Sequence, residues 1–478
     1  FFMTFCALSS AKGMDIKMMT RLRRYEENVE LIFKILYFLL AAGTFCPFIY
    51  DSSLQPILVK MVLGVGGILL FLRAADWKHY IRMPGLSWMA LFVLSFLLSS
   101  FMNRRYGMSE NFKWMIWMIL QMGCLYTCKL DRSRESYEKE FRILSHVMLG
   151  YSMIAAICSF WQLLQGTALK WITQSGEVML SGYHWGRLWG IYTDPNYGAG
   201  FHALCTLMAL YFFWNVKKWW RYIYLFPMLL SVLYIGFSDS RTSALMLCAG
   251  CGAYFLFTQI QSADKKDRTK RGIAGGLMIA AAVILVFSGM HLMKKAYNQQ
   301  QVPVAENTQA VDPVQKPQEI QTGREQDLQK DVSNGRIQLW KSGIEIWKTS
   351  PVYGTGYSTV VDYAKENVKG TYIIENSQGD YHNLHNQLIN VLVYQGSIGA
   401  ILLVGMFLYF CRYIWKAFQK SGIRNYDGML LCSILMILIA MMFLLEGFYT
   451  NSPGACIFWV FGGYLIHGIY QDQEQTVK

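Results

Sequence analysis

Three arginines and two histidines stand next to apolar runs in a chain that carries few charges. Arg187 shortly precedes one such run, Arg241 separates two others, Arg336 follows a polar stretch, and His382 and His385 come just before another run. Guanidinium groups stay charged and pair bidentately with phosphate oxygens. Imidazole has an ordinary pKa that suits proton transfer near neutral pH. These residue types predict a site that binds a pyrophosphate and takes a proton from a hydroxyl group.

The elements that must position these residues are helices in a membrane. The chain is 54% hydrophobic and 16% charged, whereas soluble domains carry about 25% charged residues. A helix crosses a bilayer with about 20 apolar residues, because its backbone is satisfied internally. Such runs predict an all-α polytopic membrane protein with about 12 transmembrane helices. The predicted spans are 29–50, 54–72, 84–101, 111–128, 143–165, 194–214, 222–238, 242–260, 272–291, 387–411, 428–446 and 453–470.

The basic residues predict the orientation of these spans. Lysines and arginines concentrate in alternate connections, such as 73–82, 129–139, 217–221 and 412–424, which the positive-inside rule places in the cytoplasm. The short connections of the other side hold only Arg104, Arg105, Lys170, Arg187 and Arg241. Both termini are therefore expected in the cytoplasm. Topology accounts for the net charge of +13 without a nucleic-acid partner.

The predicted organisation has one large extracytoplasmic loop, at 292–386, between the ninth and tenth spans. Residues 1–28 form a cytoplasmic N-terminal segment, 29–291 hold spans one to nine, 387–470 hold spans ten to twelve, and 471–478 form a cytoplasmic tail. Within the loop, 299–332 is rich in Gln and Pro and is expected to be flexible. Residues 335–349 predict an amphipathic helix that ends near Ser350–Pro351. Its expected apolar face holds Ile337, Trp340, Ile344 and Trp347.

The residues around the arginines carry structural alternatives. Asp194 and Pro195 predict an N-cap and first turn for the sixth span, whereas Asn196 is a candidate for lining a polar cavity. Arg241 lies in a connection so short that two spans must turn sharply there. Its alternative role is to anchor a helix, by snorkelling or by pairing with Asp239.

Neither a metal nor a cofactor is predicted. His382 and His385 could be half of a metal site, but a third ligand is not evident and the outer connections contain no DxD pair. The eleven cysteines lie mostly inside apolar runs, where cysteine behaves as a small hydrophobe. Cys248 and Cys251 have CxxC spacing, which in mid-membrane indicates close helix packing.

Over residues 180–460 the chain resembles the O-antigen ligase and O-antigen polymerase superfamily of bacterial glycan-assembly proteins. The resemblance rests on a set of short motifs and on their order along the chain. The motifs are Arg187 with Asp194-Pro195-Asn196, Ser240-Arg241-Thr242-Ser243, Gly335-Arg336 followed by Trp340, Pro351, Gly354 and Gly356, and His385-Asn386 ahead of Gly396 and Gly399.

The resemblance implies a metal-independent, inverting glycosyltransferase of the cytoplasmic membrane. Its donor would be an oligosaccharide on a polyprenyl pyrophosphate (undecaprenyl type), and its acceptor a hydroxyl at the outer face. His385 corresponds to the base, Arg241 and Arg336 to the main pyrophosphate ligands, and Arg187 to an additional cation. The accessory candidates are His382, Asn196, Asn386 and Tyr381. Expected partners are the lipid-linked glycan, membrane lipid and other polysaccharide-assembly proteins.

Polymerisation of lipid-linked repeat units is the first expectation, and ligation of finished glycan to another acceptor is the alternative. A 12-span secondary transporter is a different class, whose sign would be charges deep within spans. Its candidate residues are Lys34, Lys60, Lys113 and Glu446, of which the lysines are expected to snorkel from span ends. A non-catalytic scaffold of the same fold is the third alternative.

Overall fold

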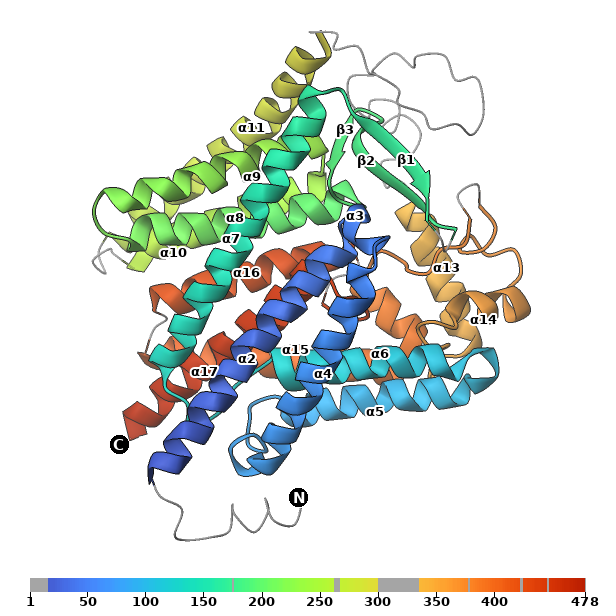
Figure 1. Cartoon of the computed structure of the whole chain (residues 1–478), viewed down its shortest axis with the longest axis horizontal. Coiled ribbons are helices and arrows are strands. Elements are labelled where there is room, and N and C mark those ends of the chain that lie inside the picture. The colour runs from blue at the N-terminus through green and yellow to red at the C-terminus, as the bar shows by residue number, and fades with distance from the viewer. Residues whose placement is uncertain are drawn as a thin grey trace.

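The computed structural model describes residues 16–173, 176–261, 267–299, 335–376, 379–421, 424–444 and 447–477. The chain is mostly helical (Figure 1). Six helical stretches are long and apolar enough to cross a membrane by length and composition. They are Leu54–Ala75 (α4), Arg134–Leu164 (α7), Trp219–Ser238 (η4 and α9), Arg241–Gln261 (α10), Arg268–Met293 within α11, and Gln387–Gln419 within α15. A polytopic membrane protein is thereby supported.

A helix also lies at each of the other six predicted spans. These helices are α2 (Ile16–Thr44), α5 (Leu86–Met102), α6 (Met108–Leu120), α8 (Pro195–Asn215), α16 (Asn425–Met441) and α17 (Pro453–Val477). The count of twelve spans remains a prediction. The first and last of the predicted spans are longer than expected, since α2 begins at Ile16, inside the predicted segment 1–28, and α17 continues through the predicted tail to Val477. Of the stretch 299–332, only Gln299, the last residue of α11, lies in the described part.

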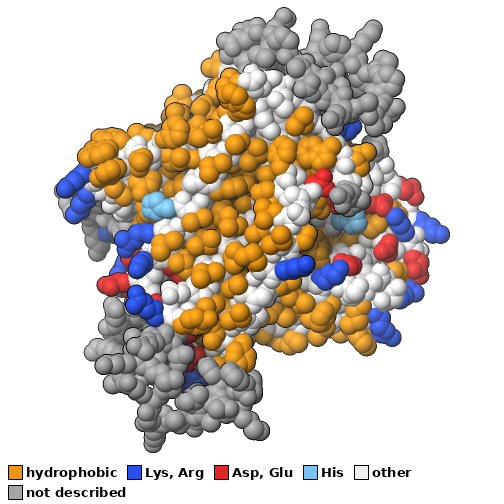
Figure 2. Space-filling view, in the orientation of Figure 1, with side chains coloured by type: hydrophobic (Ala, Val, Ile, Leu, Met, Phe, Trp, Pro, Cys, Tyr) orange, Lys and Arg blue, Asp and Glu red, His pale blue; other side chains and the backbone are white. Residues whose placement is uncertain are grey.

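Central and peripheral helices differ in what they expose. α8 packs against α9, α10 and α7 and buries most of its side chains. α11 (Arg268–Gln299) packs on α10 and α9 but leaves most of its apolar side chains exposed. Figure 2 shows hydrophobic side chains covering the visible helix faces, with Lys and Arg toward the margins. Such an apolar exterior suits a bilayer rather than water.

The prediction of an all-α chain is wrong at residues 168–190. Three antiparallel strands, β1 (Ala168–Ile172), β2 (Val178–His184) and β3 (Arg187–Gly190), form a sheet in the order β1-β2-β3. The sheet connects α7 to α8 and lies opposite the end of the helices at which α2 begins (Figure 1). The strands are short and joined through glycines, so they produce no hydropathy signal of membrane length.

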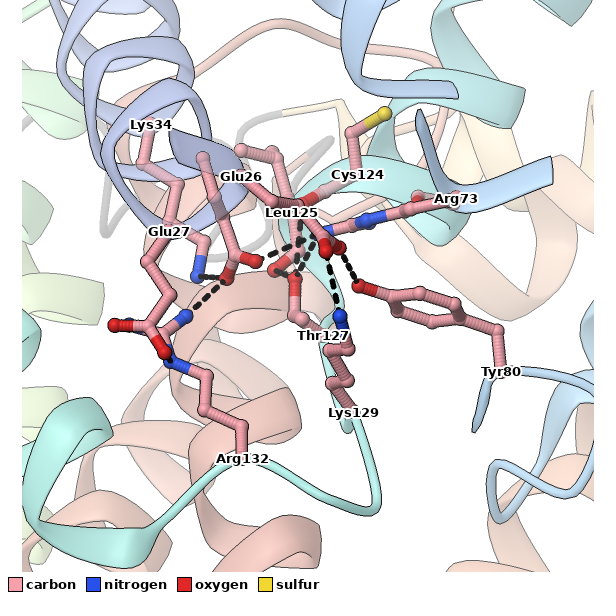
Figure 3. A network of polar contacts seen from close by, with 12 residues as sticks. Glu26, Glu27, Lys34, Arg73, Tyr80, Cys124, Leu125, Thr127, Lys129 and Arg132 are labelled. Carbon is pink, nitrogen blue, oxygen red and sulfur yellow. Dashed lines mark hydrogen bonds and ion pairs between the residues drawn. The ribbon is translucent and has the colours of Figure 1, made fainter. Parts of the chain in front are cut away.

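A buried ion network joins α2, α4, α7 and the segment that precedes α7 (Figure 3). Glu30 accepts ion pairs from Lys34, from Arg73 at 3.1 Å and from Arg132 at 3.1 Å. Lys34 and Arg132 also pair with Glu140. The expectation that Lys34 snorkels is therefore wrong, because its side chain is fully buried between two carboxylates.

Charged residues buried among the helices are the feature expected of a transporter. Here, however, the charges pair with one another and link several helices. The other transporter candidates differ from Lys34. Lys113 is exposed and pairs with Glu110, Lys60 is exposed, and Glu446 lies outside the described residues.

We expect Lys34→Met to destabilise the protein by about 3–5 kcal/mol, because it leaves Glu30 and Glu140 buried with fewer cations. Lys113→Met removes an exposed pair and should change stability by less than about 1 kcal/mol. Thermal unfolding of both variants in the same detergent measures the difference. Equal transition temperatures for the two variants would contradict the structural role of the network.

The helix α15 (Gln387–Ser421) is broken at Gly396, whose φ of 65° and ψ of −165° are not helical. The segment 351–356 replaces the backbone hydrogen bonds that the helix loses at Gly396. Val393 and Tyr394 carbonyls accept the amides of Thr355 and Gly356, each at 2.9 Å. Ser397 in turn donates its amide to the Pro351 carbonyl at 2.8 Å. A broken membrane helix is tolerated when protein groups satisfy its backbone in this way.

Gly396→Ala should destabilise the protein by more than about 3 kcal/mol, since the position needs a backbone conformation restricted to glycine. A Cβ there would also lie 2.3 Å from the Val352 carbonyl oxygen. Gly64→Ala on α4 is the matched control, because its Cβ would meet no atom within 4 Å. Thermal unfolding in detergent measures both variants, and an unchanged Gly396→Ala protein would refute the tight fit at the break.

Candidate functional site

Arg187 and the start of α8 form one side of the candidate site. Asp194 caps α8 by accepting the Asn196 amide at 2.6 Å, and Pro195 occupies the first turn, which confirms both predictions. Arg187 opens β3 and is 8% exposed. Its Nε donates to the Ser238 carbonyl at 2.7 Å and its Nη2 to the Asn196 side-chain oxygen at 2.8 Å. Asn196 therefore holds a cation in place, and Arg187 ties the sheet to α8 and α9.

Arg241 projects from the tight turn between α9 and α10. α9 (Leu225–Ser238) ends at Asp239, whose φ of 53° turns the chain sharply, and Arg241 begins α10, as predicted. The Ser243 hydroxyl donates to the Asn196 carbonyl at 3.3 Å, so the first turns of α10 and α8 are in contact. Arg241 is exposed and forms no ion pair with any described carboxylate. The alternative of pairing with Asp239 is thus not observed in the described part of the chain.

Arg336 is the first residue of α13 (Arg336–Thr349), which confirms the predicted helix and its end before Pro351. The predicted apolar face is right in part, because Trp340 and Trp347 pack against the core while Ile337 is exposed. The fully buried residues lie beside that face and are Leu339, Ser342, Gly343 and Ile346. The reason is packing against α15, where a Cβ at Gly343 would lie 2.8 Å from Ile389 and Leu384 side-chain atoms. The small residues therefore face the neighbouring helix.

This docking holds Arg336 near the start of α15. The guanidinium of Arg336 lies over the Phe443 ring, 5.6 Å from its centroid. The Trp340 indole donates to the Leu384 carbonyl at 3.1 Å, which attaches α13 to the residue before His385. A cation thus lies beside the candidate base.

His385 is held in a strained backbone conformation with φ of 50°. Its amide donates to the Asn383 side-chain oxygen at 3.0 Å. The Nδ1 atom is buried and has no hydrogen-bond partner among the described residues. Strained residues and unpaired buried polar atoms of this kind are often retained for function.

The surroundings of His385 favour its neutral form. Burial lowers the pKa of His385 from its ordinary 6.5, and the nearby Arg336 charge lowers it further. The Asp194 carboxylate acts in the opposite direction. A neutral imidazole can accept a proton at neutral pH. The charges of Arg336 and Asp194 therefore both act on His385.

The accessory candidates have different environments. Asn386 caps α15 by accepting the amides of Leu388 and Ile389 at 3.1 and 3.2 Å, so it has a structural role. Tyr381 places its ring against His385, with centroids 6.5 Å apart and planes at 78°, and burial raises the pKa of its hydroxyl. His382 is exposed, and only its carbonyl makes a described bond, from the Tyr394 hydroxyl at 2.9 Å.

The structure adds residues that were not predicted. Phe443, under Arg336, comes from the segment after α16 and has no local sequence signal. Tyr372 stacks on Tyr381 with centroids 6.2 Å apart, and its hydroxyl lies next to Gly335. Ser238 could have been suspected from the polar run around Arg241, but its bond to Arg187 joins residues 51 positions apart.

Comparison with known proteins gives one family. Residues 226–404 match the family model described as O-antigen ligase. The matched region spans α9 to the first part of α15 and contains Arg241, Arg336 and His385, whereas Arg187, Asp194 and Asn196 precede it. No curated protein matches the chain.

Proposed function

We propose that this multi-pass membrane protein, which matches the O-antigen ligase family model over residues 226–404, transfers glycan from a polyprenyl pyrophosphate to an acceptor hydroxyl. The observation that carries the proposal is the buried, unpartnered Nδ1 of His385 beside the Arg336 guanidinium. A base next to a fixed cation is the arrangement that such a displacement requires.

In the proposed reaction, the acceptor oxygen attacks the anomeric carbon while the bond from that carbon to the pyrophosphate oxygen breaks. The acceptor proton goes to His385 Nδ1, and the electron pair of the broken bond leaves with the pyrophosphate. Arg336 and Arg241 would neutralise the charge that develops there. Attack from the face opposite the leaving group inverts the anomeric configuration. None of these steps needs a metal ion.

Each arginine has a distinct part in this proposal. Arg241 is exposed and has no described ion pair, so its guanidinium group is accessible to phosphate oxygens. Arg336 lies over the Phe443 ring, and its charge acts on His385. Arg187 is bonded to Ser238 and Asn196, so we assign it the positioning of the α8 start and a background positive charge.

The positive-inside pattern supports a site on the outer face of the cytoplasmic membrane, with both termini in the cytoplasm. Polymerisation remains our first proposal and ligation the second, because the two reactions share donor chemistry. Their difference lies in the acceptor, which is another lipid-linked repeat unit or a different molecule.

The test is the size of lipid-linked and total glycan in cells that express the wild type or His385→Ala. If the protein is a polymerase, the wild-type ladder should collapse to single repeat units on the carrier. If it is a ligase, full-length polymer should accumulate on the carrier in the mutant. Identical glycan profiles for the two proteins would refute the proposed function.

A further inference from the structure

The turn between β2 and β3 carries a tryptophan in an unusual place. His184 pairs with Arg187, which leaves Trp185 and Gly186 as a two-residue turn with φ values of 49° and 70°. Turns with two positive φ values prefer Asn-Gly, because side chains such as Trp strain the left-handed conformation. Trp185 is also 71% exposed. A strained aromatic residue that is mostly exposed gains little from the fold at this position, which points to a ligand.

Two neighbouring rings extend the surface of Trp185. The Trp189 ring lies edge-on to it, with centroids 5.8 Å apart and planes at 68°. The His184 ring lies 5.9 Å from Trp185 and 6.4 Å from Trp189. His184 Nε2 is 2.9 Å from the Ser181 carbonyl and 3.0 Å from the Leu169 carbonyl, which fixes the ring. We call Trp185, Trp189 and His184 the aromatic shelf.

The shelf also contains an unused hydrogen-bond donor. Trp189 Nε1 is buried and has no acceptor in the part of the chain that the structure describes. Buried indole N–H groups usually have a partner. A ligand that combines an apolar face with hydroxyl oxygens would suit the exposed Trp185 ring, and it would reach the Trp189 donor only if that indole turned outward.

The shelf is continuous with the arginine site. Trp185 is two residues before Arg187, whose guanidinium bonds to Asn196 at the start of α8. Trp189 follows Arg187 by two residues on β3, and residues two apart along a strand are about 7 Å apart, close to the size of one or two sugar rings. The segment 178–186 contains no Asp, Glu, Lys or Arg, so its chemistry suits a neutral ligand rather than a charged lipid headgroup.

We propose that the aromatic shelf binds the saccharide of the lipid-linked donor, with the apolar face of a sugar ring against Trp185. This proposal rests on the proposed function, because it assumes that the pyrophosphate lies at the arginines. The competing role for an exposed tryptophan is anchoring in the membrane interface.

The test uses the full-length protein in lipid nanodiscs and two probes. The probes are the repeat-unit oligosaccharide released from the carrier by mild acid, and polyprenyl pyrophosphate without sugar. The key variant is Trp185→Asn, because Asn suits the left-handed turn and should keep or raise thermal stability. Trp219→Ala is the matched control, since Trp219 is 65% exposed on η4 (Trp219–Tyr224), away from the sheet.

We expect Trp185→Asn to weaken oligosaccharide binding at least tenfold and to leave binding of polyprenyl pyrophosphate unchanged. Trp219→Ala should bind both probes as the wild type does. Wild-type affinity of Trp185→Asn for the oligosaccharide would overturn the proposal. The proposal would also be overturned if brominated lipids quenched the part of the tryptophan fluorescence that is lost in Trp185→Asn. Such quenching would place Trp185 in the membrane.

The failure of this proposal is distinguishable from failure of the proposed function. If the shelf is wrong but the function is right, the His385→Ala defect and the pyrophosphate affinity persist while Trp185→Asn binds sugar normally. If the function is wrong, polyprenyl pyrophosphate does not bind and His385→Ala has no effect on glycan. A loss of oligosaccharide binding in Trp185→Asn would then still identify a glycan site.

Discussion

His385→Ala is expected to lower the rate of glycan transfer by roughly 10²- to 10⁴-fold, the usual contribution of a general base. The buried Nδ1 of His385 is the group that would take the acceptor proton. The measurement is single-turnover transfer from purified lipid-linked donor, with thermal unfolding as a check on folding. Because α15 begins two residues later and is capped by Asn386, the alanine variant should keep the helix start intact.

His382→Ala is the matched control for this prediction. His382 is three residues away and exposed, and its only described contact is made by its carbonyl, which alanine retains. It should transfer glycan at the wild-type rate. If His382→Ala lost activity and His385→Ala kept it, the assignment of the base would be reversed.

Arg336→Gln is expected to reduce transfer by roughly 10²- to 10³-fold, a loss comparable to that of one oxyanion-stabilising donor. The effect should appear mainly in the rate of the chemical step, because the charge on the leaving pyrophosphate grows in the transition state. The same single-turnover assay at saturating donor measures it. Arg105→Gln is the control, since Arg105 is exposed and pairs with Glu366 at 3.0 Å.

The Arg336 variant should also change the pH dependence of the residual activity. In the wild type, burial and Arg336 lower the pKa of His385 below 6.5, so activity should be lost only as the pH falls through that lowered pKa. Removing the Arg336 charge removes one of the lowering causes. The acid limb should therefore move to higher pH in Arg336→Gln. An unshifted limb would show that Arg336 and His385 do not act at one site.

The linear order of residues determined many elements of this protein. The apolar runs predicted where helices lie, because each run satisfies its own backbone and needs no distant partner. Asp194-Pro195 predicted the start of α8, and the residues around Arg336 and Pro351 predicted the bounds of α13. Capping and proline effects depend on neighbours within one helical turn. The order of the motifs was also sufficient to indicate the family, which the match over 226–404 supports.

Contacts between segments that are far apart in the sequence determined the features that the sequence alone did not predict. Arg187 was predicted as an additional cation of the site, but its bonds to Asn196 and to Ser238, 51 residues away, bury it. The face of α13 followed from the fit of Gly343 on α15.

The roles of Lys34 and of the two histidines were decided in the same way. Lys34 was predicted to reach the membrane edge, yet Glu140, 106 residues away, holds it inside. His382 and His385 cannot be ranked from their spacing, because burial and the proximity of Arg336 distinguish them. The sequence by itself thus determined which helices form and which residue types are available. Only the tertiary structure decided which charges are neutralised and which remain for a ligand, because pairing depends on side chains far apart in the chain.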